Sequence, residues 1–154
     1  MKHKNIVASF LILMRGKKVL LLKRLNTGYH DGDYGLIAGH VEAGETFTDA
    51  IIREAKEEAG ISLKPDYLKV VHVMHRKSDL DKSERVDVYF LAKKWGGKIT
   101  NKEPNKCSEL KWFEANKLPS NTIGAIRKAI TAVIKEIPYS EYGWQQDKSD
   151  AEMA

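Results

Sequence analysis

Three glutamates, Glu54, Glu57 and Glu58, lie at positions i, i+3 and i+4 of a segment with a helical pattern. At roughly 100° per residue these positions share one helix face, so the three carboxylates repel one another unless a cation lies between them. Clustered hard oxygen ligands suit Mg²⁺ or Mn²⁺. For the triplet alone, a solvated acidic face is the more frequent explanation. The residues around it decide between the two interpretations.

The same segment predicts a helix over residues 46–59 that can pack on a sheet. Thr46 or Thr48 can cap its start, and Gly60 is well placed to end it. Its apolar positions recur at helical spacing beside the acidic face: Ile52, Ala55 and Ala59. We therefore expect one face to join a core while the neighbouring face presents carboxylates to a cleft.

The rest of the chain predicts strands and one further helix. Apolar or β-rich runs indicate strands at 6–14, 19–22, 36–38, 67–74, 86–92 and 110–113. The stretch 25–35 is rich in glycine and aspartate and predicts a loop. An amphipathic pattern predicts a helix over 123–137, ended by Pro138. This mixture of elements predicts an α/β class.

Composition indicates an ordinary globular protein. Of the 154 residues, 42% are hydrophobic and 31% charged, which excludes wholesale disorder. A single cysteine excludes an internal disulfide, and no apolar run is long enough to span a bilayer, so we expect a cytoplasmic protein with no membrane partner. The net charge of +5 suits an anionic partner. We expect residues 1–144 to form a single domain and 145–154 a flexible tail.

The acidic segment resembles the Nudix box, G-x5-E-x7-R-E-U-x-E-E-x-G-U, where U is a bulky apolar residue. The matching positions are Gly39, Glu45, Arg53, Glu54, Ala55, Glu57, Glu58, Gly60 and Ile61. Seven fixed identities at this spacing arise by chance with odds on the order of 10⁻⁸ per position. Ala55 is smaller than the usual residue there, and His40 replaces a common second glycine. The resemblance is expected to span residues 5–137.

The resemblance implies the Nudix fold, an α/β/α sandwich with a mixed central β-sheet. It implies hydrolysis of a nucleoside diphosphate linked to another group X. By the same resemblance Glu54, Glu57 and Glu58 bind the divalent cations, Mg²⁺ or Mn²⁺, with the Gly39 carbonyl as a further ligand.

Two further box residues are implied to support these ligands. Glu45 braces the loop and Arg53, and Arg53 orients a ligand carboxylate. A carboxylate accepts a proton from the attacking water, and the resemblance leaves Glu54 and Glu57 open as that general base.

Outside the box, similarity to MutT-like members suggests further site residues. Arg24 is implied to contact phosphate, although a surface charge explains it too. Glu109 is the first candidate for an additional metal ligand and Glu103 the second. His40 can touch phosphate from the box loop. Asn121 can read a base edge, but we favour it as a cap of the last helix.

The box handles only phosphates, so the group X stays open. We expect a (deoxy)nucleoside triphosphate cleaved to monophosphate and pyrophosphate; ADP-ribose, a dinucleoside polyphosphate or a nucleotide sugar are alternatives. A non-catalytic nucleotide or RNA sensor is the alternative from another class, disfavoured because every acidic box position is present. The sequence shows no stripe of basic and aromatic residues, so we do not expect a nucleic-acid partner. Many relatives dimerise, so the resemblance also allows a homodimer.

Overall fold

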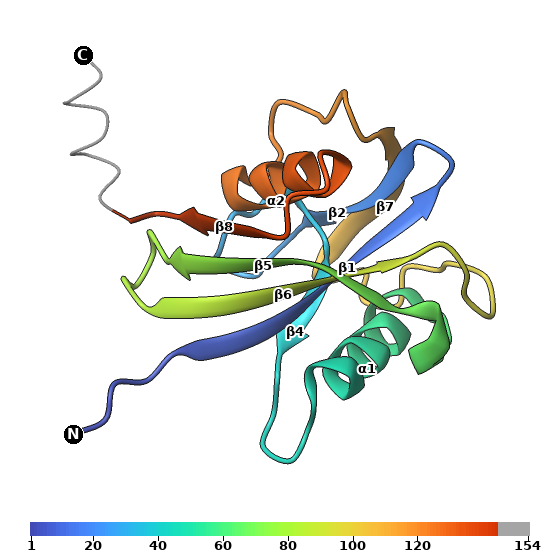
Figure 1. The fold of residues 1–154 in the computed structure, drawn as a ribbon. Coiled ribbons are helices and arrows are strands. Elements are labelled where there is room, and N and C mark those ends of the chain that lie inside the picture. Colours follow the sequence, from blue (N-terminus) through green and yellow to red (C-terminus); the bar gives the residue numbers. More distant parts are fainter. Residues whose placement is uncertain (145–154) are drawn as a thin grey trace.

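The computed structural model describes residues 1–144, in which one sheet and two helices account for most of the chain (Figure 1). In chain order the elements are β1 (Ile6–Arg15), β2 (Lys18–Arg24), β3 (Tyr34–Gly35), β4 (Ile37–His40), α1 (Phe47–Ala59), the short 3₁₀ helix η1 (Pro65–Tyr67), β5 (Lys69–Lys77), β6 (Glu84–Ala92), β7 (Cys107–Glu114), α2 (Gly124–Ile134) and β8 (Tyr139–Tyr142).

The eight strands form a mixed sheet. Its main path runs β3-β2-β1-β6-β5-β8, while β4 pairs with β1 and β7 pairs with β2. The pairs β1–β6 and β5–β8 are parallel, and the other pairs are antiparallel. The predicted mixed sheet is therefore confirmed.

The two helices cover opposite faces of the sheet (Figure 1). Successive strand residues point to opposite faces, so Leu11 packs with the α1 side and Ile12 with the α2 side. α1 contributes Ile51 and Ala55 to the first core, and α2 contributes Ile130 to the second. This arrangement confirms the α/β/α sandwich.

The ends of α1 follow the sequence signals. Thr46 is the N-cap and forms a reciprocal capping box with Asp49, so Thr46 rather than Thr48 satisfies the first backbone donors. Gly60 ends the helix in the left-handed conformation, with φ of 68°. The helix that carries the glutamates is thus fixed at both ends.

One strand was missed by the sequence analysis, and two expectations need correction. β8 was not predicted, because its sequence Tyr-Ser-Glu-Tyr lacks apolar alternation. α2 ends at Ile134, three residues earlier than predicted. Its N-cap is Ile123 without a side-chain cap, so the preferred role of Asn121 as a helix cap is wrong.

Two further expectations concern the tail and membrane-spanning segments. The predicted tail, 145–154, lies outside them. Within residues 1–144, no helix has the length and apolar character needed to cross a membrane.

Candidate active site

Four carboxylates line one cavity of 440 Å³ beside α1: Glu54, Glu57, Glu58 and Glu103. The first three come from the helix, and Glu103 comes from the segment between β6 and β7. Arg24, at the end of β2, and Lys106 line the same cavity. Carboxylates and basic side chains therefore face one partly open cavity, which suits a metal ion with a bound phosphate.

Arg53 connects the helix to the loop before it. Its guanidinium donates two hydrogen bonds to Glu45, at 2.7 and 3.0 Å, and one to Glu54, at 2.5 Å. It also reaches Glu57 at 3.4 Å and the carbonyl of His40 at 3.2 Å. One side chain thus fixes the orientation of the Glu54 carboxylate relative to the loop.

Glu45 is held as a carboxylate by this contact. The hydrogen bonds from Arg53, with a backbone hydrogen bond from Glu42, lower the pKa of Glu45 from 4.5 to about 2. The Glu42 amide donates to Glu45 at 2.9 Å, which closes the turn of the loop. The loop and the helix therefore share a charged network.

β4 lies directly against the acidic helix face. A Cβ added at Gly39 would overlap the side chain of Glu54, so this position requires glycine for close approach. The neighbouring amide of Ala38 donates to Glu58 at 3.1 Å. The strand therefore sets the positions of two of the three helix glutamates.

Burial and mutual repulsion disfavour the charged forms of Glu54 and Glu58. Burial is the largest cause that raises the pKa of Glu58, and the nearby Glu54 raises it further. Burial also raises the pKa of Glu54, against the opposing effect of Arg53. Positive charge from the protein, which Arg53 supplies to Glu54, therefore does not offset the cost of burying the Glu54 and Glu58 carboxylates together.

The donor set fits a hard divalent cation, although it is not closed around one point. Within residues 1–144, no three acidic, histidine or cysteine side chains already converge as a metal cage. Arg53 and the Ala38 amide hold the oxygens of Glu54 and Glu58 instead. All of these donors are oxygen atoms, which Mg²⁺ and Mn²⁺ prefer as ligands. A bound divalent cation would also neutralise the charge of the crowded carboxylates.

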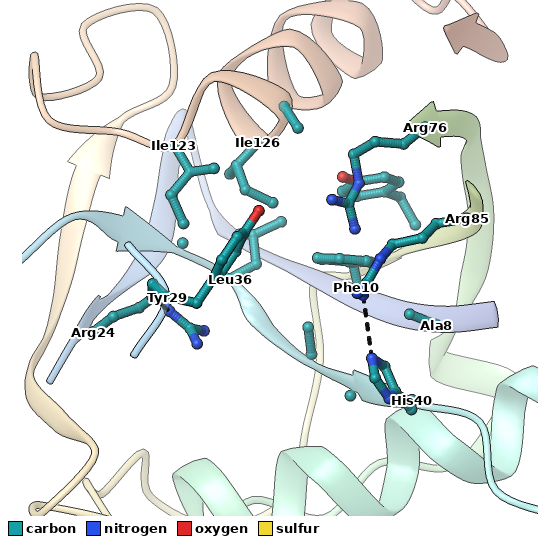
Figure 2. A pocket seen from close by; sticks show the side chains of 15 residues that line it. Ala8, Phe10, Arg24, Tyr29, Leu36, His40, Arg76, Arg85, Ile123 and Ile126 are labelled. Atoms are coloured by element: carbon teal, nitrogen blue, oxygen red, sulfur yellow. Dashed lines mark hydrogen bonds between the residues drawn. The ribbon is translucent and has the colours of Figure 1, made fainter. Parts of the chain in front are cut away.

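A second cavity, of 370 Å³, lies between the sheet and α2 (Figure 2). Its basic lining residues are Arg24, His40, Arg76 and Arg85, and no aspartate or glutamate among the described residues lines it. Its apolar lining includes Phe10, Leu36, Ile123 and Ile126. Because Arg24 lines both cavities, the second cavity adjoins the acidic one.

The loop between β2 and β3 places Tyr29 in the second cavity. Asp31 accepts hydrogen bonds from the amides of Thr27 and Gly28, each at 2.9 Å, which fixes the loop. Arg24 donates to the carbonyl of Tyr29 at 2.7 Å and lies 5.5 Å from its ring centre. In Figure 2 the ring projects into the cavity, so this loop shapes its mouth.

Comparison with known proteins identifies the family. The model of the NUDIX domain matches residues 3–133, which include the helix, the loop and most of the sheet. The chain belongs to the Nudix hydrolase family. A MutT Nudix hydrolase from Burkholderia pseudomallei has a similar structure, with a TM-score of 0.76 and 27% identity over 84% of this chain and 98% of that one.

Curated Nudix relatives carry several names. The ADP-ribose pyrophosphatase of Methanocaldococcus jannaschii is 33% identical over 70% of this chain and 61% of its own length. The NAD-capped RNA hydrolase NudC of Pseudomonas putida is 28% identical over 76% of this chain and 40% of its own length. The chain thus spans less than two thirds of either relative.

The structure brings most of the expected Nudix site together. Gly39 and Arg53 lie against Glu54, Glu45 contacts Arg53, and Arg24 lines the acidic cavity. His40 lies in the second cavity instead, where its Nε2 is 3.3 Å from Nη1 of Arg85.

Two expected residues lie away from the acidic helix. The carboxylate of Glu109 accepts a hydrogen bond from the hydroxyl of Tyr34 and does not line the acidic cavity, whereas Glu103 does. Glu103, and not Glu109, is therefore the fourth acid that lines the acidic cavity. Asn121 donates to the carbonyl of Gly32 at 2.9 Å and thereby ties the loop to the segment before α2.

Sequence reasoning found Arg24 and His40 but missed four other polar residues of the second cavity. Tyr29, Arg76, Arg85 and Tyr89 come from a loop and two strands outside the Nudix box. Alternation along 67–74 and 86–92 predicted the strands but not their register, and register alone brings these side chains together. Arg76 and Arg85 lie just outside the predicted strands 67–74 and 86–92 but inside β5 and β6, so neither was expected on the sheet.

Proposed function

We propose that this chain is a divalent-cation-dependent pyrophosphohydrolase that cleaves a nucleoside diphosphate linked to a group X. A (deoxy)nucleoside triphosphate, cleaved to monophosphate and pyrophosphate, is the foremost substrate. The observation that carries the proposal is the position of the three helix glutamates beside Arg24 in one cavity. Membership of the Nudix family and the hydrolase names of relatives support it.

Mg²⁺ or Mn²⁺ would be held by Glu54, Glu57 and Glu58, with the Gly39 carbonyl and Glu103 as further donors. When bound, the cation neutralises diphosphate charge and lowers the pKa of a coordinated water. A diphosphate otherwise repels a nucleophile through its own negative charge.

The protein residues supply orientation and proton transfer. Arg24 binds a phosphate oxygen next to the acidic cavity. Arg53 holds Glu54 in one orientation through the 2.5 Å contact, and Glu45 holds Arg53. Glu54 or Glu57 accepts the proton of the attacking water, while the exposed position of Glu57 favours access to solvent.

The substitution Glu57→Gln tests the metal assignment. It removes a charged oxygen donor while the partly exposed site tolerates the amide. We expect Mg²⁺-dependent pyrophosphate release from a nucleoside triphosphate to fall by at least about 100-fold, with an unchanged circular dichroism spectrum. Glu114→Gln, at the far end of β7, is the matched control and keeps full turnover. Wild-type turnover by Glu57→Gln would show that Glu57 is not a ligand.

ADP-ribose is the second candidate substrate, because a relative at 33% identity is named an ADP-ribose pyrophosphatase. A turnover screen with Mg²⁺ and Mn²⁺ over canonical and oxidised triphosphates, ADP-ribose, dinucleoside polyphosphates and nucleotide sugars ranks these groups. Single-stranded RNA belongs in the same screen. Tight salt-sensitive RNA binding with no turnover of any nucleotide would contradict the hydrolase proposal.

A further inference from the structure

Two arginines occupy directly opposed positions on neighbouring antiparallel strands. Arg76 of β5 pairs with Arg85 of β6, so both side chains leave the same face of the sheet. Both line the second cavity, and Figure 2 shows them reaching toward it from the same side. Their side chains are 10% and 18% exposed. Like charges opposed in this way destabilise a sheet, so the pair calls for a compensating anion.

The protein compensates this charge only in part. Asp87, which is fully buried, accepts from Nε of Arg76 at 2.6 Å and lies 3.5 Å from its Nη2. Arg85 is 3.6 Å from the exposed Asp81 and also contacts Ser83 and His40. Arg24 adds another positive charge to the same cavity. The cavity thus keeps a net positive lining.

A buried hydroxyl without a partner lies in the same lining. Tyr89 is fully buried, and its hydroxyl is the one buried side-chain polar atom in the described residues that lacks a hydrogen bond. Its ring stacks on Phe10 at 4.7 Å, which fixes its place beside the two arginines on the same sheet face. An unsatisfied buried donor is costly, so a ligand oxygen that the hydroxyl reached after a small side-chain movement would stabilise it.

The second cavity therefore has an apolar part and a polar part. Leu36, Ile123 and Ile126 give one part an apolar lining that suits a flat ring, and Arg24 connects that part to the acidic cavity. The arginine pair and Tyr89 provide the polar part. A ligand that satisfies every part carries a diphosphate, a ring and a further anionic group.

We propose that Arg76, Arg85 and Tyr89 form a subsite for a phosphate monoester on the part of the substrate that is not cleaved. The substrate is then a nucleoside diphosphate linked to X, a triphosphate included, whose uncleaved nucleoside part carries an additional phosphate monoester. Two guanidinium groups and a hydroxyl match the several oxygens and the double charge of a phosphate monoester. This inference rests on the proposed function, because it places the diphosphate at the acidic cavity.

Binding without metal tests the subsite independently of hydrolysis. Isothermal titration in EDTA compares AMP with adenosine 2′,5′-bisphosphate and adenosine 3′,5′-bisphosphate, which differ by one phosphate. We expect at least one bisphosphate to bind about 10-fold more tightly than AMP or better. Equal affinities for the three ligands, or no detectable binding of any, would overturn the proposal.

Two variants assign the preference to the arginines. Arg85→Gln removes the more exposed guanidinium, and Arg76→Lys retains a positive charge beside Asp87 while it removes the planar fork. We expect Arg85→Gln to lose the bisphosphate preference, so that AMP and the bisphosphates bind with equal affinity. Lys93→Gln removes one positive charge from an exposed site outside the cavity and keeps the preference. If Arg76→Lys fails to fold, Arg85→Gln decides alone, and full preference in that variant overturns the proposal.

The two proposals fail in different ways. Hydrolysis of simple nucleotides with no bisphosphate preference would retain the hydrolase and remove the subsite. A bisphosphate preference that depends on Arg85, with no hydrolysis of any nucleotide in Mg²⁺ or Mn²⁺, would retain the binding subsite and remove the hydrolase.

Discussion

Gly39 is the residue at which one additional carbon disturbs the site most directly. Its hydrogen leaves room for the Glu54 side chain, and any Cβ would overlap it. Strand and helix therefore approach more closely here than two ordinary residues allow. This close approach places the Gly39 backbone beside the Glu54 carboxylate, the two groups that we propose as metal ligands.

The substitution Gly39→Ala should displace Glu54 while the fold persists. We expect kcat/KM to fall by about 10-fold or more, because Glu54 must move away from its ligand position. Gly96→Ala is the matched control, since its Cβ would meet Ser62 at an ordinary 3.5 Å. Equal kcat/KM values for the two variants would show that the contact is not critical.

Glu45 gives the molecule a pH-dependent contribution to stability. Its pKa falls from 4.5 to about 2 on folding, so the unfolded chain takes up this proton at higher pH than the folded one. The contribution is present above pH 4.5 and is lost as pH falls from 4.5 toward 2. We expect the difference in unfolding free energy between wild type and Glu45→Gln to shrink over that range in urea titrations. A constant difference would contradict the sign of the shift.

At the scale of elements, α1 depends on its caps as much as on its core face. The Thr46 hydroxyl accepts from the Asp49 amide at 3.0 Å, and Asp49 accepts in return from the Thr46 amide at 3.1 Å. Reciprocal bonds of this kind hold the first turn, from which the glutamates take their positions.

Replacing the cap should weaken the whole domain. We expect Thr46→Ala to lower the free energy of unfolding by about 1 kcal/mol, because the Asp49 amide loses its side-chain acceptor. Thr48→Ala, two residues later, lies inside the helix and should be close to neutral. Chemical denaturation measures both variants, and an equal effect of the two would contradict the capping assignment.

The acidic helix was predictable because its information is local. Box spacing, Thr46, Gly60 and the apolar stripe all lie within a few turns of one another. β8 was not predictable in this way, since Tyr139 and Ser140 join the sheet only through their register with β5. Short polar strands carry no period of their own.

At the scale of the molecule, the second cavity depends on long-range pairing. Arg76 and Arg85 meet because β5 and β6 pair in one register, and α2 closes the cavity from more than thirty residues further along the chain. A shift of one residue would send either side chain to the other face. Long-range structure also explains why the sequence ranked Glu109 above Glu103 as an additional metal ligand. Only the fold shows that Glu103 lines the cavity beside α1, whereas Glu109 contacts Tyr34.

Arg24 lines both cavities, and this shared position has a thermodynamic consequence. Any occupant that draws its guanidinium toward one compartment changes the affinity of the other. Coupling of this kind is reciprocal, so whatever factor one ligand imposes on the second, the second imposes on the first. The order in which the two ligands are added can then change the rate at which the doubly occupied protein forms, but not its population at equilibrium.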